Sequence, residues 1–247
     1  MASEHAATAR PVFLLSPANC GGKRAQLLVR PTAEFPLALR LRDGGAPLGE
    51  VFQFMSGLYF RGKLAYGEAF AGRVPEAGRG SEGGGVYVMA PGSGLVPPST
   101  MVRLPDLIAM ASVGVASDEP RFREPLERDI QSLASRLHPD DPVVLLGSIA
   151  TGKYVDVIER ALEGRLRFPA EFVGRGDMSR GGLMLRCVAS GSELTYVPIA
   201  GATRHGKRPP RLAPLRRGPG ATPVLVNRID SRPPKVRRSP EPAPRKA

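Results

Sequence analysis

The fold class is decided by one stretch of the sequence, PVVLLGSIATGK at residues 142–153. Val143–Leu146 is an uninterrupted aliphatic run, which is typical of a strand covered on both faces. Residues 147–153 form a loop of small residues, in which Thr151 is a candidate N-cap for a helix that buries Val155, Ile158 and Leu162. A strand, a glycine loop and a helix in succession indicate an α/β fold with parallel strands.

The same order recurs on both sides of this stretch. Val12–Leu15 and Val86–Ala90 are further strand patterns that end in small-residue loops, and residues 166–173 form a fourth, near an edge because of Pro169. Helical patterns lie at residues 24–30, 58–71 and from Pro125 to Leu137. Residues 183–188 and 194–199 are expected to form a hairpin. We therefore expect a mainly parallel sheet in three layers, with helices on both faces, a C-terminal hairpin and a disordered basic tail.

Charge is distributed unevenly along the chain. The 247 residues are 42% apolar and carry a net charge of +12, so disorder throughout is excluded. Residues 203–247 hold 13 of the 35 basic residues, 2 of the 23 acidic residues and 10 of the 26 prolines. Such a segment buries too little apolar surface to offset its ordering entropy. We expect a flexible arm at residues 1–11, one α/β domain at 12–202 and a disordered Pro/Arg-rich tail at 203–247.

Three features indicate a cytoplasmic protein. The first apolar run, Val12–Leu15, is too short for a signal-peptide core, and the longest uncharged stretch, residues 83–102, is broken by prolines and glycines. The two cysteines, Cys20 and Cys187, give no disulfide framework. We expect no membrane association and no cofactor, and the sequence does not indicate an oligomeric state.

Ligand-binding residues are expected where parallel strands end, because open α/β sheets bind ligands outside the carboxyl ends of their strands. Four proposed strands end in glycine-containing loops, three of which also carry cations, and backbone amides at helix starts favour anions. An anionic ligand, most simply a phosphate of a nucleotide or nucleic acid, is therefore predicted. Ordinary turns with solvated lysines are the alternative. The candidate ligand-binding residues are Ser16, Cys20, Lys23, Gly94, Gly147, Ser148, Lys153, Arg175, Ser179 and Arg180.

Residues 147–153 also satisfy the glycine and lysine spacing of the phosphate-binding loop of NTPases. Tyr154 stands where that motif needs a Ser or Thr to ligate magnesium, and a phenol cannot place its oxygen at the same distance. No second, magnesium-holding acid follows a later strand. The sequence therefore disfavours an NTPase.

The candidate catalytic residues are Asp177 and Asn19, which lie in two of these loops. Asp177 is expected in a polar loop at residues 174–182, where flanking arginines would keep it ionised as a general base or electrostatic stabiliser. A purely local pairing with the arginines is the alternative. Cys20 precedes a helix start, which favours a thiolate, although a buried inert thiol is the alternative. The three histidines are far apart in sequence, so no metal site is predicted.

Three short motifs carry a resemblance to a known family. Ser16 with Asn19-Cys20 and Lys23, residues 56–61 with Ala65-Tyr66, and Ala90 with residues 94–100 resemble an uncharacterised bacterial and phage α/β domain. That domain is similar to the uracil-DNA glycosylase-like fold, which also occurs in archaeosine-synthase-type tRNA enzymes. Residues 144–150 resemble the strand end of such glycosylases. The resemblance implies an N-glycosidic hydrolase or a base-modifying enzyme.

The sequence also departs from that family. Ser16-Pro17-Ala18-Asn19 stands where a glycosylase carries its water-activating acid, and residues 174–179 stand where a histidine loop is expected. Neither catalytic group is present, and the related domain's lysine before Gly-Leu is missing too. Two hypotheses follow: a glycosylase-like enzyme acting on nucleic acid, or a non-catalytic module that binds a nucleotide or nucleic acid.

In either case the basic tail is expected to hold a nucleic-acid backbone. Tyr59, Phe60, Tyr66 and Tyr154 are either base-stacking residues or core residues. A partner protein whose tail contacts acidic surfaces is a further alternative. The tail cations expected to bind nucleic acid are Arg204, Lys207, Arg208, Arg211, Arg216 and Arg217.

Overall fold

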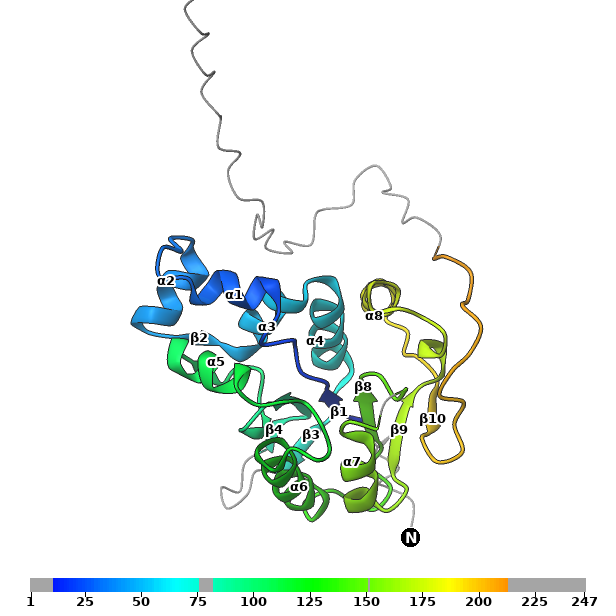
Figure 1. Cartoon of the computed structure of the whole chain (residues 1–247). Coiled ribbons are helices and arrows are strands. Elements are labelled where there is room, and N and C mark those ends of the chain that lie inside the picture. The colour runs from blue at the N-terminus through cyan, green and yellow to red at the C-terminus, as the bar shows by residue number, and fades with distance from the viewer. Residues whose placement is uncertain (1–10, 76–81, 151, 213–247) are drawn as a thin grey trace, which may run out of the picture. The chain divides into compact units, whose positions relative to one another are not determined.

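A computed structural model describes residues 11–75, 82–150 and 152–212 (Figure 1). The strands within them are β1 Val12–Leu15, β2 Ala46–Pro47, β3 Arg73–Pro75, β4 Glu82–Gly84, β5 Val86–Ala90, β6 Gly94–Val96, β7 Met101–Val102, β8 Val143–Leu146, β9 Leu166–Pro169 and β10 Tyr196–Pro198. The helices are α1 Lys23–Val29, α2 Pro36–Asp43, α3 Leu48–Ser56, α4 Leu58–Phe70, α5 Leu104–Ala111, α6 Pro120–Ala134, α7 Val155–Leu162 and α8 Asp177–Ser190, with a 3-10 turn at Ala170–Phe172.

Six strands form the main sheet, in the order β10-β9-β8-β1-β5-β6. The four inner strands are parallel, with Phe13 of β1 opposite Val86 on one side and Val144 on the other. Both edge strands, β6 and β10, are antiparallel to their neighbours. The prediction of an α/β fold with a mainly parallel sheet is confirmed.

Alternation along the strands divides the buried side chains into two clusters. In β1, Phe13 and Leu15 join residues from α1–α5 and α8, whereas Val12 and Leu14 join residues from α6 and α7. Because successive side chains of a strand point to opposite faces, the two clusters lie on opposite sides of the sheet. Figure 1 shows α4 on one side of β1, and α6 and α7 on the other.

The helix predicted from Pro125 begins earlier than expected. α6 starts at Pro120, and the Glu119 carboxylate caps it by accepting a hydrogen bond from the Arg121 amide at 3.1 Å. Its buried face contains Phe122, Leu126, Ile130 and Leu133. The apolar spacing identified the face correctly, but the cap lies outside the apolar pattern.

The predicted C-terminal hairpin is wrong. Residues 183–188 belong to α8, and β10 pairs antiparallel with β9 instead. Residues 177–182, expected in a loop, form the first half of the same helix. The pattern misled us because α8 has only two fully buried residues, Gly181 and Met184, so its apolar stripe is weak.

A close crossing of α4 and α8 explains Gly62 in α4 and Gly181 in α8. A Cβ atom on Gly62 would lie 2.6 Å from the Gly181 carbonyl oxygen, and one on Gly181 would lie 2.5 Å from the Leu58 carbonyl oxygen. Two backbones at this separation leave no room for side chains. α8 is therefore held directly against α4.

Parts of the sequence-based interpretation lie outside the described residues. These parts are residues 1–10 of the N-terminal arm, the proposed helix cap Thr151, and the tail cations Arg216 and Arg217. Residues 203–212 are described and form no helix or strand. They pass close to α8, since a Cβ atom on Gly182 would lie 3.7 Å from the Leu212 side chain. No helix in the described part of the chain is long and apolar enough to cross a membrane.

Candidate functional site

A cavity of about 530 Å³ opens at the carboxyl ends of the parallel strands. Ser16 follows β1, Pro91 follows β5 and Ser148 follows β8, so the three strand ends meet there. Its volume lies within the range of small-ligand pockets, roughly 300–1,000 Å³. The lining residues are Ser16–Gly21, Pro91, Met110, Ala111, Val113–Val115, Ser148, Lys153 and Tyr154.

A buried lysine contacts one of the residues that line this cavity, Ser16. Lys63 of α4 is 1% exposed, and its Nζ donates hydrogen bonds to the carbonyl oxygen and the hydroxyl of Ser16, at 2.8 and 2.9 Å. The ammonium also lies 4.3 Å from the centre of the Tyr59 ring and 5.1 Å from that of Phe60. Lys63 is therefore held between two aromatic faces and the end of β1.

Burial changes the protonation of Lys63. Desolvation lowers the pKa of its amine from 10.5 to about 7, an effect that Asp177 opposes and Arg180 reinforces. Among the described residues, the carboxylate within electrostatic range is Asp177, whose ion pair is with Arg180 rather than Lys63. A buried amine without a paired carboxylate readily loses its proton near neutral pH.

Tyr154 organises the loop after β8. Its hydroxyl accepts a hydrogen bond from the Ser148 amide and donates one to the Ser148 carbonyl, both at 3.1 Å. A Cβ atom on Gly147 would lie 2.8 Å from this hydroxyl and 2.9 Å from the Ser16 Cβ atom, which explains the glycine. The Ser148 amide therefore donates its hydrogen bond to a phenol, whereas a phosphate-binding loop keeps its amides for the phosphate. This arrangement does not support the NTPase interpretation.

The arginines and the aspartate near the start of α8 form a polar cluster beside Lys63. Asp177 is the first residue of α8, with its side chain 67% exposed and 3.6 Å from the Arg180 guanidinium. Arg180 donates to the Phe172 carbonyl at 3.1 and 3.2 Å, and Arg175 donates to the Ser179 hydroxyl at 3.3 Å. The cavity described above is not lined by Arg175, Asp177, Ser179 or Arg180. The catalytic role of Asp177 stays a prediction.

The loop after β1 supplies one wall of the cavity. The Asn19 side chain accepts a hydrogen bond from the Gly21 amide at 3.2 Å, and Cys20 is buried beside it. Burial raises the pKa of the Cys20 thiol to about 12, so the thiol is protonated at neutral pH. Lys23 is the exposed first residue of α1 and does not line the cavity.

Two sets of candidate residues have positions that suit packing. Gly94 of β6 has φ +76°, and a Cβ atom there would lie 2.7 Å from the Pro125 carbonyl oxygen, so this glycine meets α6. Tyr59, Phe60, Tyr66 and Tyr154 are each at most 9% exposed. These four rings belong to the core, as the second of the two sequence-based alternatives stated.

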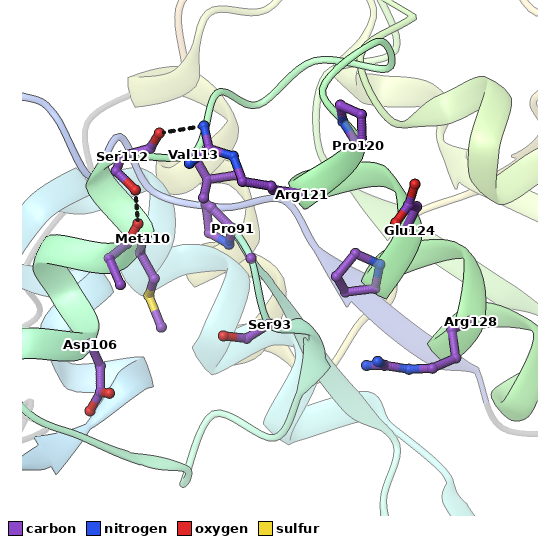
Figure 2. A pocket seen from close by; sticks show the side chains of 13 residues that line it. Pro91, Ser93, Asp106, Met110, Ser112, Val113, Pro120, Arg121, Glu124 and Arg128 are labelled. Carbon is purple, nitrogen blue, oxygen red and sulfur yellow. Dashed lines mark hydrogen bonds between the residues drawn. The ribbon is translucent and has the colours of Figure 1, made fainter.

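A second cavity of about 710 Å³ adjoins the first and shares Pro91, Met110 and Val113 with it. Figure 2 shows Arg121 and Arg128 of α6 among its lining residues, together with Asp106 and Glu124. Arg121 is already engaged, because it donates to the Ser112 carbonyl at 3.0 Å and pairs with Glu119. The mixture of charges makes this cavity less suited to an anion than the first.

The described tail cations lie along neighbouring elements. Arg204 is 3.9 Å from Asp156, which is the second residue of α7, and the Lys207 backbone passes directly beside Gly174. Arg204, Lys207, Arg208 and Arg211 are all exposed. They therefore form a basic segment that leads from the start of α7 towards α8.

Lys63 is the main residue that sequence reasoning missed. Its charge excludes it from the apolar residues of the helical pattern at 58–71, although the spacing of Phe60, Lys63 and Gly67 matches one buried face of α4. A cation at such a position is the signal that would have identified it. Among the described residues, no group of histidines, cysteines and carboxylates is arranged to hold a metal. No family model, curated protein or solved structure matches the chain.

Proposed function

We propose that the protein is nucleic-acid-associated and holds one nucleotide unit, or a single base of DNA or RNA, in the cavity at the carboxyl ends of β1, β5 and β8. The observation that carries this proposal is the composition of the cavity wall. Asn19, Ser148 and Lys153 supply polar groups at the mouth, whereas Met110, Val113 and Val115 supply an apolar side. A nucleotide has this same division into an anionic phosphate and a flat apolar base.

The basic segment supports a polymeric ligand. Four exposed cations occur in residues 203–212 without an acidic residue, and Arg204 approaches the start of α7 next to Lys153. Cations in this position would contact the phosphates that flank a nucleotide in the cavity. The two buried clusters on opposite sides of the sheet also support the three-layer arrangement expected from the sequence.

Binding is better supported than the glycosidic reaction that the family resemblance implies. A glycosylase-like reaction would need a carboxylate beside the bound sugar, and Asp177 is not among the cavity-lining residues. We therefore propose binding as the function, and treat base removal or base modification as an outcome that the experiment below would reveal.

Oligonucleotide binding to the full-length protein tests this function. Lys153→Ala is expected to weaken the binding of a short single-stranded oligonucleotide at least about tenfold, since a hydrogen bond to a charged group contributes roughly 1.5–3 kcal/mol and about 1.4 kcal/mol corresponds to tenfold. Arg160→Ala is the matched control, because it removes one exposed cation from the opposite end of α7. Equal effects of the two substitutions, or no binding by the unmodified protein, would contradict the proposal. Mass spectrometry of the recovered oligonucleotide reports any loss or change of a base.

A further inference from the structure

The contacts of Ser16 suggest more than a binding role. Its hydroxyl lies 2.9 Å from the Lys63 amine, and Ser16 lines the cavity while Lys63 is sealed beneath it. A serine hydroxyl becomes a nucleophile when an adjacent base can take its proton. Serine–lysine pairs are one of the arrangements that achieve this in acyl transfer.

The position of Lys63 suits a base better than a structural cation. A buried ammonium without a carboxylate partner costs several kcal/mol, so an apolar side chain would serve stability better at this point of α4. The groups that face Lys63 are Ser16 from the loop after β1, Tyr59 and Phe60 from its own helix, and Asp177 and Arg180 from α8. Near neutral pH a fraction of Lys63 is neutral and has a lone pair to accept a proton.

Tyr154 is a second neighbour of the Ser16 hydroxyl. A hydrogen bond with Ser16 lowers the pKa of the Tyr154 phenol, against the larger effect of burial, which raises it. The phenol therefore stays protonated at neutral pH. Its bonds to Ser148 fix its position, so the Ser16 hydroxyl has both an amine and a phenol as hydrogen-bond partners.

We propose that Ser16 is a nucleophile, with Lys63 as its general base, for the transfer or hydrolysis of an acyl group carried by a carboxylic ester. This activity goes beyond the proposed nucleotide binding, which needs the cavity but no reactive serine. The Ser16 oxygen forms a bond to the acyl carbon while its proton moves to the Lys63 nitrogen. The carbon–oxygen bond to the alcohol then breaks, and the alcohol leaves with the proton from Lys63. Water afterwards hydrolyses the serine ester, releasing the carboxylic acid and restoring the hydroxyl.

Acylation of the full-length protein by p-nitrophenyl acetate tests this proposal. We expect p-nitrophenol to be released and one acetyl group to become attached to each chain. Peptide mass spectrometry is expected to locate this acetyl group on Ser16. Lys63→Met is expected to slow this acetylation about 100-fold, the lower end of general-base effects. Ser16→Ala is expected to abolish it. Ser190→Ala, an exposed serine at the end of α8, is the control and is expected to leave the rate unchanged.

A pH series separates a catalytic role of Lys63 from a structural one. The acetylation rate of Ser16 is expected to rise through pH 7 and then level off, as Lys63 loses its proton. Circular dichroism establishes that each variant is folded, and Ser16→Ala, which removes one hydroxyl, is the variant least able to disturb the core. The proposal would be overturned if Ser16 stays unacetylated in the folded protein, or if Lys63→Met is acetylated at the original rate. Either result leaves oligonucleotide binding, and hence the proposed function, intact.

Discussion

Burial of Lys63 lowers the stability of the fold and at the same time lowers the pKa of the amine, so that it can act as a base. The helix that carries it is built from apolar and small residues on the buried face, and the lysine takes one position of that face. Its hydrogen bonds to the end of β1 recover part of the cost of burial. The remainder appears as a lowered pKa, so the chemistry of the site follows from the packing of α4 against β1.

Stability is predicted to depend on pH through Lys63. In the unfolded chain the lysine keeps its proton to about pH 10.5, whereas the folded protein releases it above about pH 7. The unfolded state therefore binds more protons between pH 7 and 9, and the free energy of unfolding rises with pH by roughly 1.4 kcal/mol per unit from this group. Urea unfolding at pH 7, 8 and 9 measures this rise.

Lys63→Met is the matched variant for this measurement. Methionine removes the titrating amine and keeps an unbranched side chain, so the dependence on pH between 7 and 9 should flatten. Above pH 9 the buried Cys20 thiol acts in the opposite direction, because its pKa is raised on folding. If the protein and the variant show the same slope between pH 7 and 9, Lys63 is not the titrating group.

At the scale of elements, the strands were predictable and α8 was not. Val12–Leu15, Val86–Ala90 and Val143–Leu146 are apolar runs, and the structure places all three in the parallel part of the sheet. In α8, Gly181 allows the close contact with α4, a helix that is far from it in the sequence. Local patterns cannot report a contact of this kind. For the same reason the strand ends in the site could be predicted, but Lys63 and its approach to Ser16 could not.

The crossing of α4 and α8 can be tested with two neighbouring glycines. Gly181→Ala places a methyl group 2.5 Å from the Leu58 carbonyl oxygen, so the helices must separate, which is expected to cost at least about 1–3 kcal/mol of stability. Gly182→Ala, the next residue of α8, meets only the Leu212 side chain at 3.7 Å. It should be neutral or stabilise the helix by up to about 1 kcal/mol. Thermal unfolding compares the two, and equal melting temperatures would show that the helices do not cross at Gly181.

At the scale of the whole molecule, the charges and the cavity are expected to contribute separately to binding. Protein cations that contact the phosphates of a nucleic acid give an affinity that falls as the salt concentration rises. A cavity instead selects one nucleotide unit. The four described cations of the basic segment lie beside α7 and Gly174, outside the cavity. Their removal should therefore change salt dependence more than it changes preference among bases.

Substitution of these four cations by glutamine is predicted to lower the slope of log affinity against log salt by up to about 3 for single-stranded nucleic acid, since each phosphate contact contributes about 0.7. Fluorescence anisotropy at several salt concentrations measures the slope. The control is a protein in which four other cations are replaced, Arg30, Arg40, Arg42 and Arg160. An equal loss of slope in the control would show that the basic segment has no special part in binding.

Photocrosslinking tests most directly whether a nucleotide enters the cavity. A single-stranded oligonucleotide that carries one photoreactive thiopyrimidine is irradiated with the full-length protein, and the crosslinked peptides are identified by mass spectrometry. We expect adducts on residues that line the cavity, namely residues 16–21 after β1, Met110, Ala111 and residues 113–115 at the end of α5, or Ser148, Lys153 and Tyr154 after β8. Adducts confined to residues 203–247 would instead mean that the tail alone contacts nucleic acid and that the cavity does not hold a nucleotide.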